Sequence, residues 1–234
     1  MSRKEGKEET RKALIAAAVE VFSARGISNS KVADIVKAAG VAQGTFYVHF
    51  RTKGDVVDYV VRSFNHNHGT MLVKEAVRHL RHGAHAVIAA QSRAHIKMWR
   101  DHAKLFPLFV DHFARHSRDE PLLIRDVADV VAAFAEEVTR SGSVERRVPS
   151  REIARIIVTL WRQSGLHVAR DQELSVDDAA RTLELSTVAI YDALAPGLTA
   201  ITPKGLAAAY RNIVTAHNKR AAKRKRAVAP VSGG

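Results

Sequence analysis

The sequence has no cysteine, and this absence excludes several kinds of chemistry. Without a thiol the chain can form no disulfide, present no thiol nucleophile and bind no metal through thiolate. A chain without cysteine also fits a reducing compartment. The absence of cysteine therefore excludes cysteine catalysis and zinc fingers that bind their ion through cysteine.

Long apolar runs are also missing. No stretch approaches the roughly 18 consecutive apolar residues that a membrane span needs. The polar start MSRKEGKEET lacks the apolar stretch of a secretory signal. The sequence therefore predicts a protein of the cytoplasm.

Positive charge is concentrated at the two ends of the chain. The 234 residues carry a net charge of +13, with 46% hydrophobic and 26% charged residues, which is typical of a globular protein of one large or two small domains. Residues 1–62 hold 11 Lys/Arg against 7 Asp/Glu, and residues 217–226 hold 6 against none. Basic ends indicate a polyanionic partner such as nucleic acid, although a merely soluble basic protein shows the same excess.

Glycine and proline are sparse, with 13 and 6 residues, and apolar residues recur at spacings of three and four along most of the chain. No segment alternates over the length of a strand, so we expect an all-α protein. A first helix is predicted at about 10–24, ended by Gly26. Ser30 is predicted to cap a second helix at 31–38, and Thr52 a fourth helix with Asp55 in its capping box.

The remaining helices follow from the same periodicity. A third helix is predicted at 42–50 after a turn at Gly40, and the fourth at 53–80, with a break near Gly69 left open. The others are expected at 84–103, 105–116, 121–140, 150–169, 176–194 and 203–218. The basic tail 219–234 has no apolar stripe and is expected to be disordered.

Residues 31–50 have the pattern of two helices joined by a short turn that contains glycine. The apolar positions would hold the pair together, and they are Ile35, Val36, Ala39, Val41, Phe46 and Phe50. Gln43, Thr45, Tyr47 and His49 would then point outward. A helix with such a polar face fits the major groove of DNA, which is about 12 Å wide. Gly44 would let the backbone approach the duplex closely.

The same stretch carries a set of residues at fixed spacings: Ala18 to Phe22, Gly26, Ile35-Val36, Ala39-Gly40-Val41, Gly44-Thr45, Tyr47, His49-Phe50 and Lys53. In these residues the chain resembles the TetR/AcrR family of transcriptional regulators. The resemblance covers residues 8–68 and implies a three-helix DNA-binding domain there, with its helix-turn-helix at 31–50. It further implies a helical effector-binding and dimerisation domain at 69–218.

The resemblance also implies roles for single residues. Tyr47 and His49 would contact phosphates, and Lys53 would hold another phosphate at the positive end of the fourth helix. Gln43 and Thr45 would read bases. The predicted DNA-binding set is completed by Lys31, Ala42 and Gly44. Three positions depart from the family pattern: Ala42 replaces a Ser or Thr cap, Val36 replaces Ala, and Gly54 replaces an acid after Lys53.

Aromatic residues after position 70 lie on apolar helix faces and are either core or the lining of a ligand pocket. They are Trp99, Phe106, Phe109, Phe113, Phe134 and Trp161. His102 and His167 would supply the few polar contacts of such a pocket. The expected effector is a small, mostly apolar molecule, and no cofactor is predicted.

Histidine is frequent, with 12 residues, nine of which lie between His66 and His116. His112 and His116 are spaced by four, which places two imidazoles on one helix face and leaves a metal or haem site as an alternative. The sequence has neither Glu-x-x-His nor His-Glu-x-x-His, so no metal ligand is assigned. Many of these histidines are next to arginine in the sequence, which is typical of a solvated surface.

The late helices at 150–169 and 176–194 carry long apolar stripes. The first contains Ile153, Ile156, Ile157, Leu160 and Trp161, and the second contains Leu183, Leu185, Val188, Ile190 and Leu194. In the resembling family two late helices form the dimer interface, so we expect a homodimer. A two-fold dimer would present two recognition helices to a palindromic operator.

The sequence thus predicts a DNA-binding repressor that a small apolar ligand releases from its operator. Two alternatives stay open: a metal- or haem-responsive regulator or binding protein that uses residues 66–116, and a sequence-independent DNA-binding protein. The chain has no phosphate-binding loop and no nucleophile elbow, so we do not expect an enzyme.

Overall fold

The computed structural model describes residues 3–116, 131–132, 136, 148–197, 201–208, 210–211 and 214–215. The elements within these residues are helical, which confirms the predicted all-α fold. The short 3-10 turns are η1 (Leu80–His82) and η2 (Ala103–Leu105). The helices are α1 (Arg3–Arg25), α2 (Val32–Ala39), α3 (Gln43–His49), α4 (Lys53–His79), α5 (Ala84–Asp101), α6 (Phe106–Arg115), α8 (Ser150–Arg170) and α9 (Val176–Leu194).

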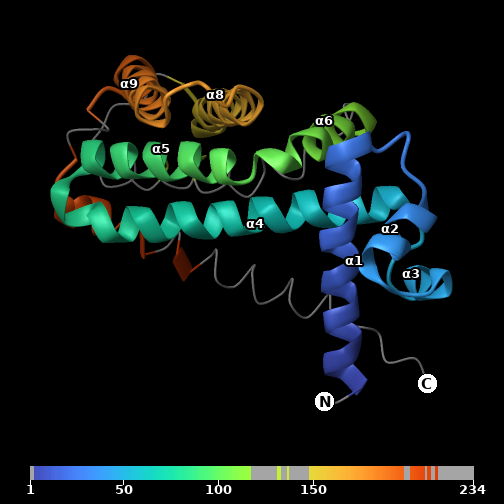
Figure 1. Cartoon of the computed structure of the whole chain (residues 1–234). Helices are drawn as coiled ribbons and strands as arrows, with labels where there is room; N and C mark the ends of the chain where they lie inside the picture. Colours follow the sequence, from blue (N-terminus) through green and yellow to red (C-terminus); the bar gives the residue numbers. More distant parts are fainter. Residues whose placement is uncertain are drawn as a thin grey trace.

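Two long helices, α4 and α5, lie side by side and form the axis of the molecule (Figure 1). Helices α8 and α9 cover α5 on the side away from α4. At the other end α1 crosses α4, and α2 and α3 lie beyond it. Helix α6 contacts both α1 and α4, so it sits where the N-terminal helices meet the rest of the protein.

Most of the predicted helix boundaries agree with the structure to within a few residues. Gly26 and Gly40 have φ values of 76° and 67°, the left-handed conformation that ends a helix without penalty only at glycine. Helix α9 has the predicted bounds. Helix α1 is longer than predicted because its polar first turns, with Glu5 near the positive end, are also helical.

Helix α4 runs without a break past Gly69, which is buried. A single glycine in a helix costs about 1 kcal/mol relative to alanine, which packing along α5 can offset. The predicted fourth helix is therefore not broken near Gly69. Because α4 also passes through residues 68 and 69, the two predicted domains share one helix.

The apolar core falls into two clusters. One is formed by the N-terminal helices together with Trp99, Leu108 and Phe109. The other is formed around α5, α8 and α9 and includes Ile96 and Ile153. The first cluster joins the N-terminal helices to α5 and α6 in one continuously packed core.

Some predicted segments lie outside the described residues, namely the helix at 121–140 apart from three positions and the tail 219–234. The described residues between 203 and 215 are helical, in agreement with the prediction for that segment. Over the part of the chain that the structure describes, no helix is both long and apolar enough to cross a membrane.

Candidate nucleic-acid interface and effector core

The helix-turn-helix is built from α2, α3 and the turn at Gly40. The amide of Val41 donates to the carbonyl of Val36 over 3.0 Å, which closes the end of α2. Helix α3 then begins after Ala42, which has extended backbone and offers no side-chain cap. A missing Ser or Thr cap weakens a helix by about 1 kcal/mol, so tertiary packing has to hold α3 in place.

That packing comes from the inner face of α3. Phe46 is completely buried, and Phe50 is 5% exposed. The ring centroids of the two residues are 5.9 Å apart. Both side chains lie in the same core cluster as Ile35 of α2. The outer face of α3 is thereby fixed in orientation although the helix is short.

The outer face presents the side chains that the sequence predicted to read DNA. Gln43 and Gly44 are exposed, Tyr47 is 55% exposed, and Thr45 and His49 are half-buried. No atom lies within 4 Å of the position that a Cβ at Gly44 would take, so the backbone there is open to a partner. Contact with DNA by these residues remains a prediction.

The N-terminal end of α1 adds positive charge beside α3, which the sequence-based assignment of DNA contacts missed. Burial, followed by the charges of Lys7 and Arg11, lowers the pKa of His49. His49 is therefore neutral at neutral pH in the chain by itself. The guanidinium of Arg11 lies 4.4 Å from the ring centre of Tyr59. The basic residues among the first twelve positions were the sequence feature that could have indicated positive charge beside α3.

Lys53 takes a position in the fold that the sequence did not predict. Its ammonium donates hydrogen bonds to the carbonyls of Ile27 (2.7 Å) and Ser30. These bonds tie the start of α4 to the loop between α1 and α2. Two of the three donor positions of an ammonium are thus in use, and the phosphate contact stays a prediction.

The prediction that Ser30 caps α2 is wrong. The N-cap residue is Lys31, and Ser30 is buried with its hydroxyl donating to the carbonyl of Gly26 over 2.6 Å. The carboxylate of Asp34 instead accepts from the amide of Lys31 over 2.8 Å. Ser30 turns back because its side chain satisfies the last turn of α1 rather than the first turn of α2.

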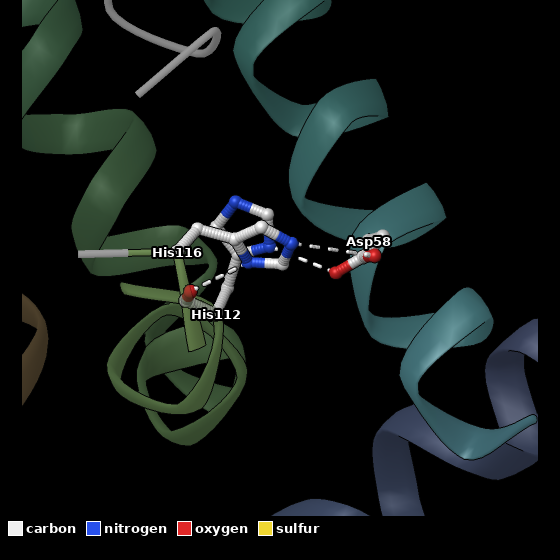
Figure 2. Close-up of side chains that lie close together, drawn as sticks. All are labelled: Asp58, His112 and His116. Atoms are coloured by element: carbon white, nitrogen blue, oxygen red, sulfur yellow. Dashed lines mark hydrogen bonds and ion pairs between the residues drawn. The ribbon is translucent and has the colours of Figure 1, made fainter. Parts of the chain in front are cut away.

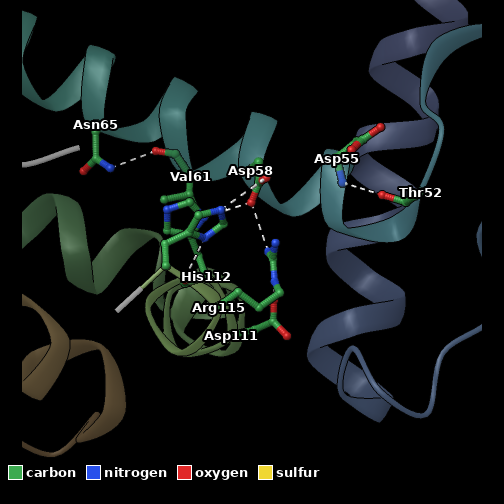
Figure 3. Close-up of polar contacts among 9 residues, drawn as sticks. Thr52, Asp55, Asp58, Val61, Asn65, Asp111, His112 and Arg115 are labelled. Carbon is green, nitrogen blue, oxygen red and sulfur yellow. Dashed lines mark hydrogen bonds and ion pairs between the residues drawn. The ribbon is translucent and has the colours of Figure 1, made fainter. Parts of the chain in front are cut away.

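The predicted cap of α4 is confirmed (Figure 3). The Thr52 hydroxyl accepts from the amide of Asp55 over 3.1 Å. The Asp55 carboxylate accepts from the amide of Arg51 over 3.0 Å. Both ends of the capping motif satisfy backbone donors that the helix leaves free, which fixes where α4 begins.

One turn further along, Asp58 joins α4 to α6 (Figure 3). Its carboxylate accepts from His112 Nδ1 over 2.9 Å and from Arg115 Nη2 over 3.0 Å. Burial raises the pKa of Asp58, but these two hydrogen bonds outweigh it, so the pKa lies below its usual value. A Cβ at Gly54 would stand 3.4 Å from Arg115 Nη1. Gly54, a departure from the family pattern, thus lies beneath the arginine that reaches Asp58.

The predicted effector aromatics pack against one another. The ring centroid of Trp99 lies 4.6 Å from that of Phe109 and 4.8 Å from that of Phe64. Phe113 is 6.0 Å from Phe109, and Phe106 is half-buried at the edge of the same cluster. Trp161 is buried in the second core, and Phe134 lies outside the described residues. Between core and pocket lining, the described packing favours core.

His102 and His167 are both exposed. Neither ring is enclosed within the described residues, and their role as polar contacts of a ligand stays a prediction. His102 lies at the C-terminal end of α5, where its Nδ1 bonds the carbonyl of Met98 over 2.8 Å. The His102 ring also meets Phe64 edge-on, with 5.6 Å between ring centroids, so it lies at the rim of the aromatic cluster.

His68 and His95, to which the sequence analysis assigned no role, are instead buried against one another. His95 Nε2 lies 2.7 Å from the carbonyl of Trp161, and His95 Nδ1 lies 2.8 Å from His68 Nε2. A carbonyl can only accept, so His95 Nε2 donates, its Nδ1 accepts, and His68 Nε2 donates to it. Burial lowers the pKa of His68 to about 4 and that of His95 well below its ordinary value. Both rings are neutral.

A separate open groove runs along α4, α5 and α9. Its floor is made of alanines, including Ala86, Ala89 and Ala90, and its sides carry charged residues such as Glu75 and Arg93. The charged sides do not suit the mostly apolar effector that the sequence predicts.

Comparison with known proteins supports the helix-turn-helix. Residues 14–60 match the family model described as bacterial regulatory proteins of the tetR family. The regulator TtgR of Pseudomonas putida is 38% identical over 65 residues, which are 28% of this chain and 31% of TtgR. The regulator AcrR of Shigella flexneri is 41% identical over 58 residues, which are 24% of this chain and 27% of AcrR. The chain thus matches less than a third of the length of these relatives.

Solved structures extend the likeness over most of the chain. The regulator FadR of Bacillus subtilis, solved in complex with stearoyl-CoA, has a TM-score of 0.58 at 20% identity, covering 76% of this chain and 97% of FadR. A TetR-family transcriptional regulator from Pectobacterium atrosepticum has a TM-score of 0.58 at 20% identity, covering 83% of this chain and 97% of its own. At such identities the likeness shows the fold.

Proposed function

Through residues 14–60 the chain belongs to the TetR family of bacterial regulatory proteins, and on that premise we propose that it is a dimeric repressor of transcription in the cytoplasm. It binds a palindromic operator through α3 and leaves it when a small apolar ligand binds the helical remainder. The observation that carries this proposal is the polar outer face of α3, which buried Phe46 and Phe50 hold in a fixed orientation.

The chemistry of this face supports sequence-specific binding. The Gln43 amide and the Thr45 hydroxyl offer both donors and acceptors, which are the groups that read base edges in the major groove. Tyr47 and His49, together with the basic first turns of α1, lie where phosphates would flank these bases. Regulators of this family are not enzymes, and the proposal needs no catalytic residue.

Selecting bound duplexes from a random pool tests the DNA-binding part. We expect a palindrome whose half-sites are separated by about one helical turn, or 10 base pairs, or a multiple of it. In the variants Gln43→Ala and Thr45→Ala, affinity for that operator should fall by about 1–3 kcal/mol per lost base contact.

Asn67→Ala is the matched control, because Asn67 is an exposed amide on α4 away from α3. It should leave operator affinity unchanged in titrations at several salt concentrations. Equal affinity of the unmodified protein for every duplex would reject this reading in favour of a sequence-independent DNA-binding protein.

The dimer is proposed through the outer faces of α8 and α9. Ile156 is 39% exposed and Leu185 is 52% exposed, and such large apolar side chains are costly to leave in water. Ile157, Leu183 and Trp161 from the predicted stripes are buried within the chain itself. The prediction from the sequence therefore assigned to the dimer interface some residues that pack in the core of the single chain. An apolar stripe does not show which of its residues face that core and which face a partner.

Replacing Ile156 and Leu185 with glutamate tests this interface. Both residues are exposed in the single chain, so the double variant should still fold, whereas a dimer would have to bury unpaired charges. Sedimentation should show a dimer for the original protein and a monomer for the variant. Circular dichroism confirms the fold of each. A variant that sediments as a dimer would move the interface elsewhere.

The apolar ligand is supported by the character of the helical remainder. The cluster around Trp99 and Phe109 is aromatic, and α4 and α6, which line it, also contact the N-terminal helices. The similar structure of FadR was solved with stearoyl-CoA, a ligand with a long apolar chain. A ligand that prefers the conformation unable to bind DNA lowers operator affinity by the ratio of its two affinities.

A further inference from the structure

Three potential metal ligands converge between α4 and α6: Asp58, His112 and His116 (Figure 2). One donor atom from each lies within 4.8 Å of the other two. Asp58 comes from the second turn of α4. His112 comes from the last turn of α6 and His116 is the residue that caps its C-terminal end, and both imidazoles lie on the side that meets α4. The ligand set is therefore assembled by helix packing across more than fifty residues of sequence.

The spacing suits a tetrahedral ion. Bonds of about 2.0–2.2 Å to nitrogen and oxygen place the ligands of such an ion roughly 3.3 Å from one another. His112 Nδ1 lies 2.9 Å from Asp58 Oδ1, and His116 Nε2 lies 3.9 Å from Asp58 Oδ2. The observed separations fall on either side of the required one, so small rotations of the side chains would bring all three donors to bonding distance. Without an ion His112 Nδ1 donates to Asp58, so on binding His112 would keep its proton on Nε2 and offer the Nδ1 lone pair to the ion.

The second nitrogen of His116 is already held. His116 Nδ1 lies 2.9 Å from the carbonyl of His112, which can only accept, so Nδ1 carries the proton and Nε2 has a free lone pair. Nε2 is the atom that faces Asp58. Metal-binding histidines commonly use one nitrogen for the ion and donate from the other to a carbonyl or carboxylate. The ring of His116 is thus oriented as a ligand would be.

Arg115 would compete with a metal ion for the carboxylate of Asp58. It donates to Asp58, but its Nε also donates to Asp111 over 2.6 Å, and about a third of its side chain is exposed. The guanidinium can therefore leave Asp58 while it keeps Asp111. A divalent ion would replace it as the positive partner of the Asp58 carboxylate.

We propose that Asp58, His112 and His116 form a binding site for a divalent transition-metal ion of the zinc class, with water completing its coordination. Two imidazoles and one carboxylate suit zinc, cobalt or nickel better than calcium or magnesium, which prefer oxygen. The ion would fasten α6 to α4. The site stands independently of the proposed repressor function, because its test measures metal binding alone.

The experiment uses the full chain without a histidine tag, first treated with a chelator. Zinc is titrated in calorimetry against a competing chelator, and cobalt is titrated while visible absorption is recorded. We expect one ion per chain and the intense absorption of tetrahedral cobalt. His116→Ala and Asp58→Asn should each weaken binding by more than the 10- to 100-fold that is typical for loss of an outer-shell partner.

These two variants are chosen because both side chains are partly exposed and asparagine keeps the shape of aspartate. The matched control is His79→Ala with His82→Ala, since these rings lie 6.2 Å apart on the surface and are a competing place for adventitious zinc. Binding that survives in His116→Ala and Asp58→Asn, or that disappears in the control, overturns the proposal. So does an original protein that takes up no zinc at micromolar concentration.

Discussion

Lowering the pH from 7.5 to 5.5 is expected to destabilise the folded protein by about 2–3 kcal/mol through two buried histidines. His68 and His95 are enclosed between α4, α5 and α8, and the hydrogen bonds of His95 to His68 and to the Trp161 carbonyl require His95 to be neutral. A proton added to His95 Nδ1 would face the N–H of His68. Burial lowers the pKa of His68 to about 4, and burial together with the neighbouring His68 lowers that of His95 well below its ordinary value.

The sign follows from where the protons bind. In the unfolded chain both histidines have their ordinary pKa of 6.5, so between about pH 6.5 and 4 the unfolded state binds more protons than the folded state. Stability is fully present above this window and is lost as the pH falls through it. At pH 5.5 each ring contributes a loss of about 1.4 kcal/mol, since one pH unit corresponds to that free energy.

Urea unfolding at pH 7.5 and 5.5, at one protein concentration, measures the effect. In His68→Gln the side-chain amide can still donate to His95 Nδ1 but takes up no proton, so the share of the pH dependence due to His68, about half of that expected from the buried pair, should vanish. His85→Gln removes an exposed histidine and should keep all of it. If His68→Gln retains the full pH dependence, the buried pair is not its source.

Gly165→Ala is expected to destabilise the protein by about 1–3 kcal/mol or more, the range for overpacked cores. A Cβ at Gly165 in α8 would lie 2.4 Å from Cδ1 and Nε1 of Trp99, which is far inside van der Waals contact. The indole cannot move aside, because Phe64 and Phe109 pack against it at 4.8 Å and 4.6 Å between ring centroids. Helices α5 and α8 would have to separate.

Gly6→Ala is the control for the general effect of this substitution. Gly6 lies in α1, and no atom lies within 4 Å of its potential Cβ. Alanine is the better helix former by up to about 1 kcal/mol, so this variant should be as stable as the original or slightly more stable. Tryptophan fluorescence during urea unfolding reports both variants. Equal stability of Gly165→Ala and the original protein would show that α8 does not need to approach Trp99 so closely.

The helix-turn-helix could be predicted from the sequence almost completely. Gly26 and Gly40 end helices in left-handed conformation, and Thr52 with Asp55 caps α4, all as predicted. The exposed face of α3 also agrees with its helical pattern. Ser30 shows the limit, because its hydroxyl bonds the preceding turn while the same sequence would equally permit a cap on the following helix.

The effector region was less predictable because its chemistry depends on which helices pack together. Trp99 and Phe109 are correctly identified as apolar, but the buried histidines near them are His68 and His95, whereas His102 and His167 are exposed. The spacing of His112 and His116 was visible in the sequence. Asp58, which makes them a candidate metal site, was not, because it approaches from another helix.

The sequence by itself determined the helices, their ends and the family of the DNA-binding domain, since caps, left-handed glycines and apolar periods act between residues within about four positions of each other. Only the tertiary structure decided that Lys53 bonds the loop before α2, that Ile157 faces the chain's own core and that Asp58 meets α6. The hydrogen bonds of Lys53 and Asp58 join residues 23 to 54 positions apart. The burial of Ile157 depends on which helix covers its side of α8. The relative rotation of packed helices sets them, and no local pattern records that rotation.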